Sequence, residues 1–329
     1  MKLLGKLVVW PIQWMKALPW AAVSGSMLYA AATQWGGHWA WVEAISHFRP
    51  FVLALCLVGC VLFLVGLSLG RVLIGLTVTV WLAWPMARYF LPPPQPEPAA
   101  GYSPQEISVA LCALPPARPG PGTAERILSW NADVVVLAGA GEEFYRENFQ
   151  AFRERYPQHH ADLLDRPNGI WCFTRFAVAK DLCKTRAKAL GGAPACDWTL
   201  QLADGSLFRL VAAHAPPPTN AASTENRRKI WDGLGPAFDK EQNARLVVGS
   251  LACTPYSAFF HDVESKAGLR DAALGHGLMP TWCPAWFPVA GLSVDHVLVS
   301  EHWQVVDRTL GESPGGEHRP VLVRLRKVR

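Results

Sequence analysis

The stretch RLVVGSLACTPYS, residues 245–257, carries an apolar run directly into a turn. Its branched apolar residues predict a buried strand, and the small and turn-forming residues after them predict where the strand ends. Many enzymes place a catalytic or metal-binding carboxylate at such a strand end. This segment contains no Asp or Glu. After Arg245, its polar side chains are hydroxyls and a thiol, at Ser250, Cys253, Thr254, Tyr256 and Ser257. It therefore lacks the charged oxygen ligand that a hard metal ion prefers.

The eight cysteines are the other residues that could do chemistry, as disulfides, metal ligands or free thiols. Cys56 and Cys60 are one helical turn apart within an apolar run, and we expect them to pack as small apolar side chains. Cys183 and Cys196 bracket the stretch CKTRAKALGGAPAC, whose length suits a surface loop closed by a disulfide in an oxidising compartment. No pair has the spacing of zinc ligands, so the cysteine pattern predicts no metal site.

The charge of the chain is unevenly distributed. The net charge is +5, and +4 of it belongs to residues 1–100, where six Lys and Arg face two Glu. The remaining 229 residues are almost neutral. Nucleic-acid binding requires a basic face on the polar part of the molecule, and the sequence has none there. A nucleic acid is therefore not an expected partner.

Three apolar runs in the first third match a hydrocarbon core about 30 Å thick, which takes roughly 20 helical residues. They lie at 17–35, 51–69 and 72–91 and predict about three transmembrane helices, with the lipid bilayer as a partner. An alternative for the first run is a signal peptide over residues 1–32, with Lys2 and Lys6 at its basic end and YAAA as the cleavage site. Polar residues and a proline between Trp10 and Lys16 interrupt the apolar stretch that a signal peptide needs.

The positions of Lys and Arg near the span ends predict the orientation in the membrane. With the N-terminus inside, Lys2, Lys6, Lys16 and Arg71 are cytoplasmic, and Arg49 and Arg88 lie outside. This orientation places the C-terminal part of the chain across the membrane. Transport by the spans themselves has little support, because no ionisable residue stands in the middle of a span.

The proline-rich stretch LPPPQPEPAAGYSPQE ends the apolar region, since consecutive prolines cannot continue a helix. We divide the chain into a transmembrane region (1–91), a proline-rich linker (92–104) and a folded domain (105–329). In that domain, short apolar runs alternate with helical stretches, which predicts a layered α/β domain. Strands are expected at 107–114, 132–139, 169–175, 207–215, 244–251, 294–300 and 319–326, and helices at 123–130, 142–156, 220–240 and 258–267.

The segments DVVVLAGAGEEF, NGIWCFTR, VAAHAPPP, RLVVGSLACTPYSAFF, SVDHVLVS and GGEHRPVLVRL follow one another in an order that resembles the endonuclease/exonuclease/phosphatase superfamily. The chain is most similar to the bacterial branch that carries membrane spans ahead of the domain. The resemblance covers residues 105–326. It implies a four-layered α/β sandwich of two packed sheets, a divalent-metal phosphoesterase site at the strand ends, and a place in a bacterial inner membrane with the C-terminal domain in the periplasm.

The family's metal-binding positions are mostly altered in this chain. The Asn that ends the first strand corresponds to Ala113, and the Glu of the family's LQE motif corresponds to Gly139. In the GDFN turn, Ser250 takes the place of the Asp and Ala252 that of the Asn. In the final SDH motif, Glu317 takes the place of the Asp. Mg²⁺ is held by oxygen ligands, usually with one or two carboxylates, so these changes predict a degenerate site without a bound metal or other cofactor.

The resemblance leaves His214, Asp295 and His318 as the catalytic positions that still match the family pattern. They would serve either to bind or protonate a phosphate or as an inherited hydrogen-bonded cluster. Glu142 and Glu143 could rebuild a metal site, although acids in a first helical turn more often favour the helix dipole.

From these residues we expect a membrane-anchored, catalytically inactive relative that acts as a binding, scaffold or accessory subunit, with other membrane-protein subunits as candidate partners. The alternative is an active metal-dependent phosphoesterase or nuclease with unusual ligands, using Mg²⁺ or Mn²⁺.

Overall fold

The computed structural model describes residues 2–35, 39–98, 105–115, 119–162, 169–238 and 242–328, without the side chains of residues 2–16 and 237. The chain forms two compact units. The first comprises residues 1–88 with Tyr256–Ala258, and the second comprises Tyr89–Pro255 with Phe259–Arg329.

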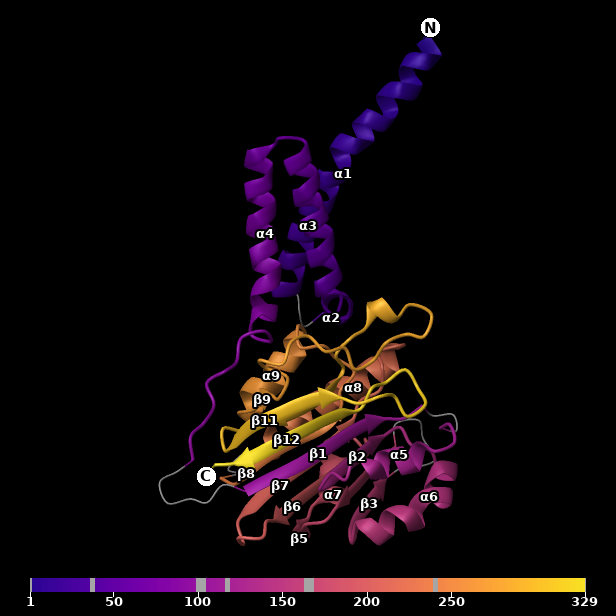
Figure 1. The fold of residues 1–329 in the computed structure, drawn as a ribbon, viewed down its shortest axis with the longest axis vertical. Helices are drawn as coiled ribbons and strands as arrows, with labels where there is room; N and C mark the ends of the chain where they lie inside the picture. The colour runs from indigo at the N-terminus through magenta and orange to yellow at the C-terminus, as the bar shows by residue number, and fades with distance from the viewer. Residues whose placement is uncertain are drawn as a thin grey trace. The chain divides into compact units, whose positions relative to one another are not determined.

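The first unit is helical. It contains α1 (Lys2–Trp35), α2 (Ala40–Ser46), α3 (Arg49–Val65) and α4 (Leu69–Ala87), and Figure 1 shows α1, α3 and α4 running alongside one another. Two glycines allow the close approach of these helices. A side chain on Gly75 would collide with the sulfur of Cys60, and one on Gly59 would press on Val23. Small residues at helix contacts are typical of bundles in membranes, where backbones must approach closely to gain packing energy.

One helix of the described residues, α4, is long and apolar enough to cross a membrane, and the sharply bent pair α2 and α3, at 66°, would make a second span if counted as one. The expected three spans are therefore not established. The described part of α1, which holds the expected span at 17–35, does not meet the same criterion. The boundaries also differ, because the turn between the second and third runs lies at residues 66–68 and Arg71 falls in the first turn of α4.

The second unit is built on two six-stranded mixed sheets. The first sheet has the order β11-β12-β1-β2-β4-β3 and the second the order β5-β6-β7-β8-β10-β9. The strands of the first sheet are β1 (Gln105–Ala113), β2 (Val134–Ala138), β3 (Gln158–Asp162), β4 (Ile170–Thr174), β11 (Trp303–Leu310) and β12 (Val321–Lys327). Those of the second are β5 (Ala177–Asp181), β6 (Ala195–Gln201), β7 (Leu207–His214), β8 (Ala244–Ser250), β9 (Arg270–Asp271) and β10 (Asp295–Val299).

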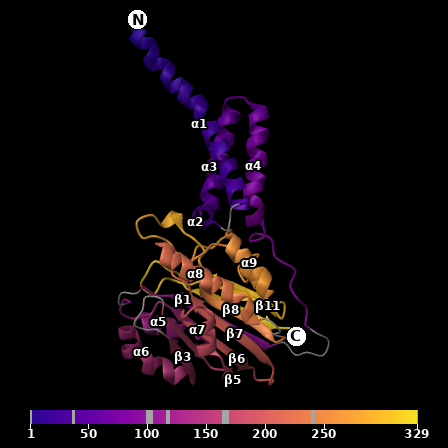
Figure 2. The ribbon, with the colours of Figure 1, turned by 180° about the vertical axis from the view of Figure 1, so that it is seen from behind.

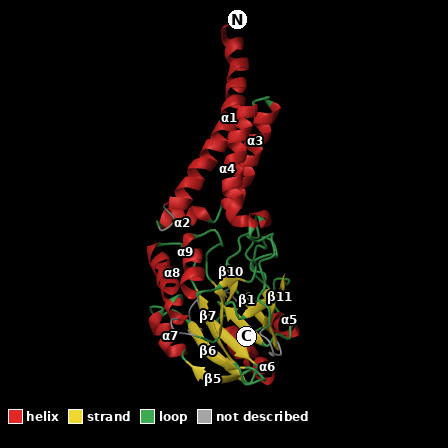
Figure 3. Ribbon diagram, turned by 90° about the vertical axis from the view of Figure 1, so that its left-hand side faces the viewer, coloured by secondary structure: helices red, strands yellow, loops and turns green. Residues whose placement is uncertain are grey.

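The two sheets pack face to face over an apolar core and helices cover their outer faces, so that the unit is an α/β sandwich (Figures 2 and 3). Side chains such as Val109 and Val136 of the first sheet and Leu210 and Val248 of the second fill the space between the sheets. Helices α5 (Thr123–Ser129) and α6 (Glu142–Arg155) pack on the first sheet. Helices α7 (Cys183–Ala189), α8 (Ala221–Leu234) and α9 (Ala258–Ala267) lie on the second-sheet side. This arrangement confirms the expected sandwich of two packed sheets with flanking helices.

Each of the seven strands expected from apolar runs is present, with ends that differ by a few residues. Strands β3, β5, β6, β9 and β11 were not expected, because most of their residues are polar or their pattern is mixed. The helix expected at 220–240 ends at Leu234, since Gly235 and Pro236 follow. The surface loop expected between Cys183 and Cys196 is wrong in part, because its first half is helix α7 and both cysteines are buried.

The proline-rich segment after α4 belongs to the second unit and packs against its second sheet. Tyr89 is buried, and its hydroxyl donates a hydrogen bond to Asp271 at 3.4 Å. Arg270 donates to the carbonyl oxygen of Pro94 at 2.9 Å and to the side-chain oxygen of Gln95 at 3.2 Å. A cavity of about 450 Å³ lies between residues 94–97 and this edge of the second sheet. Residues 99–104, the rest of the expected linker, lie outside the described residues.

Candidate functional site

The sheet topology brings the expected site residues to one edge of the sandwich. Strands β1 and β2 are parallel, as are β7 and β8, so their carboxyl ends meet at that edge. Strand β10 is antiparallel to β8, and its first residue, Asp295, stands opposite Ser250. On the other side of Ser250, His214 is its partner in β7. Because paired residues share a sheet face, His214, Ser250 and Asp295 project on the same side.

An imidazole–carboxylate pair is the best-formed element of the site. Nδ1 of His318 lies 2.7 Å from Oδ2 of Asp295. The Asp295 side chain is fully buried, whereas that of His318 retains 25% of its exposed area. With Nδ1 committed to the carboxylate, Nε2 of the same ring is the nitrogen available to a ligand. The predicted pairing of these two residues is therefore present in the structure.

The two partners shift each other's pKa. Burial of His318 opposes its protonation, but the charge of Asp295 and the hydrogen bond to it, with a contribution from Glu317, outweigh burial and raise the pKa of His318. Burial acts in the opposite direction on Asp295, yet His318 and the nearby hydroxyls of Ser250 and Thr281 lower the pKa of that carboxyl. The pair thus favours an imidazolium held against a carboxylate, which presents positive charge to an anion.

A short loop holds Asp295 in place. Oγ1 of the buried Thr281 accepts hydrogen bonds from the backbone N–H groups of Val294 and Asp295, both at 3.0 Å. The next residue, Trp282, pairs with Leu292 on one side and with His318 on the other. The loop therefore positions both members of the pair.

The carboxylate of Glu317 points to the same loop. Nε1 of Trp282 donates to Oε2 of Glu317 at 3.1 Å, and the backbone N–H of Ala285 donates to Oε1 at 2.8 Å. Both carboxylate oxygens are occupied, and the residue is exposed. The Glu317 side chain thus holds residues 282–285.

The remaining altered positions offer no charged ligand, and two of them have a special backbone. Ala113 ends β1 opposite Ala138, and both are buried. Gly139 has φ of +80° and Ala252 has φ of +51°, both in the left-handed region. An alanine side chain is unfavourable in that region, whereas asparagine tolerates it. The turn after β8 therefore has a backbone that suits Asn better than the Ala252 that occupies it.

These residues do not fit the divalent metal that the fold family implies. Among the described residues at these strand ends, one carboxylate is found, that of Asp295. It is paired with His318. Among the described residues, no three ligand atoms of His, Cys, Asp or Glu at this edge lie close enough to share an ion. Glu142 is exposed and pairs with Arg146 at 2.6 Å, in the first turn of α6. Mg²⁺ and Mn²⁺ favour oxygen ligands with negative charge, so this donor set is poorly matched to them.

Cys183 and Cys196 are free thiols in the structure, and both are buried. Cys196 lies beside Cys183 and, together with His160, lowers the pKa of the Cys183 thiol to about 7, although burial opposes this. The two sulfurs are thus neighbours, and the expected disulfide between them stays a prediction.

Sequence reasoning missed several residues that shape the site. Thr281 and Trp282 lie in an irregular loop between β9 and β10, where no apolar periodicity marks them. It also missed a group formed by His160, Asp181 and Cys183, whose ligand atoms all lie within 4.8 Å of one another. Their separation in sequence, and the presence of one cysteine rather than a pair, leave no spacing signal.

Comparison with known proteins identifies the fold. No family model matches the chain, and no curated protein matches it. Among solved structures, it is similar to TDP2 of D. rerio, in a complex with a single strand DNA product, with a TM-score of 0.54, 12% identity, and coverage of 67% of this chain and 99% of that chain. It is also similar to an endonuclease/exonuclease/phosphatase from Bacteroides vulgatus, with a TM-score of 0.52, 15% identity, and coverage of 68% of this chain and 99% of that chain.

A third structure, an endonuclease/exonuclease/phosphatase family protein from Bacteroides thetaiotaomicron, covers 69% of this chain and 99% of its own at a TM-score of 0.50 and 15% identity. The chain therefore contains the endonuclease/exonuclease/phosphatase fold. Sequence identities this low support a shared fold and nothing more, so function has to be argued from the site.

Proposed function

We propose that the second unit is a non-hydrolytic binding or accessory module built on a phosphoesterase fold. One observation carries this proposal: among the described residues, the carboxylate found at the converging strand ends, that of Asp295, is committed to His318, and that of Glu317 is committed to the loop at 282–285. A metal-dependent phosphoesterase needs charged oxygen ligands to hold the ion that neutralises the transition state. Without them, ordinary hydrolysis is not expected.

What the site retains suits recognition of an anion. His318 is partly exposed, carries a raised pKa and has its Nδ1 fixed by Asp295. An imidazolium in this setting donates a charge-assisted hydrogen bond to a phosphate or carboxylate oxygen. We propose that this nitrogen binds an anionic group of a ligand or partner without activating it for hydrolysis.

The alternative is an active phosphoesterase with unusual ligands, and the intact His318–Asp295 pair favours it. A His oriented by an Asp is a general acid or base in many enzymes. The alternative requires a metal or another cationic group to stabilise the phosphoryl oxygens, and losing one preorganised stabiliser costs roughly 10²- to 10³-fold in rate.

We further propose that the first unit anchors the protein in a membrane. Helix α4 has the length and composition of a span, and many of its exposed side chains are apolar, including Leu73, Leu76 and Val80. On α3, Val58, Val61 and Leu64 are also exposed. Apolar surface of this extent is unfavourable in water and suits lipid. A bacterial inner membrane with the second unit in the periplasm fits the placement of Lys and Arg.

The function is tested by metal binding and hydrolysis on the full chain in detergent. The wild-type protein should show no Mg²⁺- or Mn²⁺-dependent hydrolysis of phosphodiesters, phosphomonoesters or single-stranded DNA above a blank, and no heat of binding for either ion at the strand-end site. The combined change Ala113→Asn, Ser250→Asp and Ala252→Asn should create measurable affinity for Mn²⁺. Gly139 is left unchanged, since Glu at φ of +80° would be strained.

A matched control is the same triple variant with His318→Ala, which should keep the new affinity for the ion because the added oxygen ligands remain. Mg²⁺-dependent turnover by the wild-type chain, lost in His318→Ala, would overturn the proposal and establish the active alternative. If the wild-type chain bound Mn²⁺ as tightly as the triple variant does, the claim that the strand-end site lacks metal ligands would also be overturned.

A further inference from the structure

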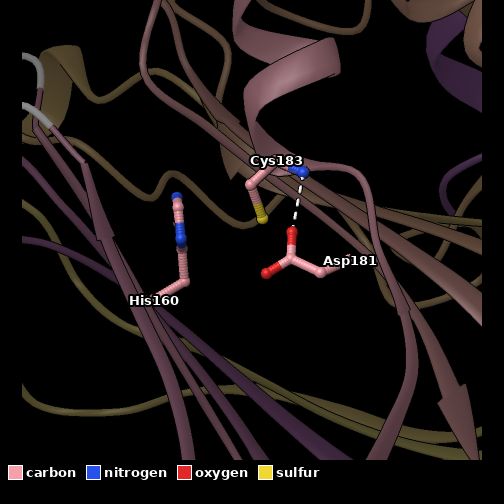
Figure 4. A group of neighbouring side chains, drawn as sticks. All are labelled: His160, Asp181 and Cys183. Atoms are coloured by element: carbon pink, nitrogen blue, oxygen red, sulfur yellow. Dashed lines mark hydrogen bonds between the residues drawn. The ribbon is translucent and has the colours of Figure 1, made fainter.

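We propose that His160, Asp181 and Cys183 bind one Zn²⁺ ion that joins the free edges of the two sheets. One atom from each side chain can be chosen so that all three lie within 4.8 Å of one another. Figure 4 shows the three side chains directed toward a common space. This group lies on β3, β5 and α7, whereas Asp295 begins β10 and His318 lies between β11 and β12, so it is independent of the function proposed above.

The group bridges the two layers of the sandwich. His160 lies in β3, the edge strand of the first sheet, and Asp181 ends β5, the edge strand of the second. Cys183 is the first residue of α7, two positions after Asp181. In the part of the chain that the structure describes, β3 pairs with β4 alone and β5 with β6 alone. An ion held here would connect two edges that no ladder of hydrogen bonds connects.

Two of the three proposed metal ligands, Asp181 and Cys183, are held in position by hydrogen bonds from backbone N–H groups. The N–H of Cys183 donates to Oδ1 of Asp181 at 2.9 Å, which is the dashed line in Figure 4. The sulfur of Cys183 accepts from the N–H of Asp197 at 3.3 Å. These bonds orient the carboxylate and the sulfur relative to each other before any ion arrives, which reduces the ordering cost of binding.

The third proposed metal ligand, His160, has a buried ring nitrogen that, among the described residues, makes no hydrogen bond of normal geometry. Nε2 of His160 is shielded from solvent and, among the described residues, makes no such bond. A polar atom buried in this way is unfavourable unless something satisfies it, and a metal ion would do so. His160 stands opposite Cys172 of β4, which fixes its position along the strand.

Nitrogen, sulfur and carboxylate oxygen together form a donor set that suits Zn²⁺. Zn²⁺ is bound by His, Cys and Asp, with bonds of about 2.0–2.3 Å, so tetrahedral ligands lie roughly 3.5 Å apart. Closing from 4.8 Å to that spacing takes side-chain rotation within the group. A thiolate ligand selects against Mg²⁺ and Ca²⁺. Since Asp181 is exposed, water can take the fourth position.

The first measurement is metal binding by the full chain in detergent, stripped with a chelator and kept reduced. Mass spectrometry should first count eight free thiols, because oxidation of Cys183 would remove a ligand. Titration with Co²⁺, a spectroscopic substitute for Zn²⁺, should then give the near-ultraviolet band of sulfur-to-cobalt charge transfer and the visible bands of a tetrahedral ion, saturating at one equivalent. Zn²⁺ should displace Co²⁺ and raise the Tm.

The variants assign the ligands. Cys183→Ser should lose the charge-transfer band, and His160→Gln and Asp181→Asn should each weaken affinity at least tenfold and lose the Zn²⁺-dependent rise in Tm. His159→Gln, at the neighbouring exposed histidine, and Cys283→Ser, at a partly exposed cysteine outside the group, are matched controls that should behave as wild type. If Cys183→Ser fails to fold, Asp181→Asn decides the matter, since its side chain is exposed.

Two results would overturn the proposal. One is the absence of stoichiometric binding by the reduced wild-type chain. The other is binding, with an unchanged spectrum, in both His160→Gln and Asp181→Asn, because the ion would then be held elsewhere. Neither result affects the proposed function of the strand-end site, which the hydrolysis and Mn²⁺ measurements test separately.

Discussion

At the scale of single residues, His318 and Asp295 make the strongest polar contact of the strand-end site, and their pKa values move in opposite directions. A raised pKa of a histidine means that its protonated form is favoured in the folded state. The stability that it contributes is complete below the unfolded value, about 6.5, and is lost as the pH rises through the folded value.

The variant His318→Gln should therefore lose stability in a pH-dependent manner. The difference in free energy of unfolding from wild type should be largest below a pH of about 6.5 and should shrink above the raised pKa. Urea unfolding at a series of pH values measures it. Asp295→Asn should abolish the pH dependence of the His318→Gln effect, and a difference that is constant with pH would contradict the paired geometry.

At Ala252 we expect substitutions to change stability in a defined order, because a φ of +51° is unfavourable for an L residue with a side chain. Ala252→Asn should stabilise the protein by roughly 0.5–1 kcal/mol, since asparagine accepts the left-handed conformation at lower cost. Ala252→Gly should also stabilise, and Ala252→Val should destabilise because a branched side chain is worst there. Denaturant midpoints give the order, and an order in which Val exceeds Asn would contradict it.

At the scale of elements, helix α7 is tied to the second sheet by a buried charge network. Asp197 of β6 is fully buried and accepts hydrogen bonds from Arg186 of α7 at 2.9 Å and from Arg209 of β7, also at 2.9 Å. Both arginines are themselves largely buried. The network explains how a strand with an Asp at its centre can stand inside the sandwich, since both oxygens of the carboxylate are satisfied.

Removing the charge of Asp197 should be strongly destabilising. Asp197→Asn removes the carboxylate that accepts from two buried guanidinium groups, and breaking a buried pair in this way costs about 3–5 kcal/mol. Chemical denaturation of the full chain measures the loss. Asp262→Asn is a matched control, because Asp262 pairs with Lys266 on an exposed helix face and should leave the midpoint unchanged. Equal effects of the two substitutions would contradict a structural role for the network.

At the scale of the whole molecule, the distribution of Lys and Arg predicts the topology in the membrane. Lys2, Lys6, Lys16 and Arg71 are expected in the cytoplasm, which places Arg329 on the other side. A C-terminal alkaline phosphatase fusion should be active, because the enzyme needs an oxidising compartment to fold. A C-terminal green fluorescent protein, exported unfolded, should be dark. The reverse pair of results would invert the topology.

The sequence by itself determined the apolar strands of the sandwich and the absence of charged side chains at Ala113, Gly139, Ser250 and Ala252. Strand β2 reads VVVLA and is buried at every position, and β8 carries Leu246, Val247 and Val248 at its centre, which suits a sheet covered on both faces. The absence of a carboxylate at Gly139 and Ser250, and of an amide at Ala113 and Ala252, is visible without coordinates, because folding cannot add a functional group that the sequence lacks.

Only the tertiary structure decided what the remaining polar groups do. The sequence cannot tell that Glu317 turns to Trp282 and Ala285, because a flexible side chain chooses among partners that the fold supplies. Strands β3 and β5 show no apolar pattern that would mark a strand in the sequence. Each forms because a neighbouring strand, β4 or β6, pairs with it. His160 and Cys183 meet for the same reason: the packing of two sheets, and not the spacing in sequence, brings their side chains together.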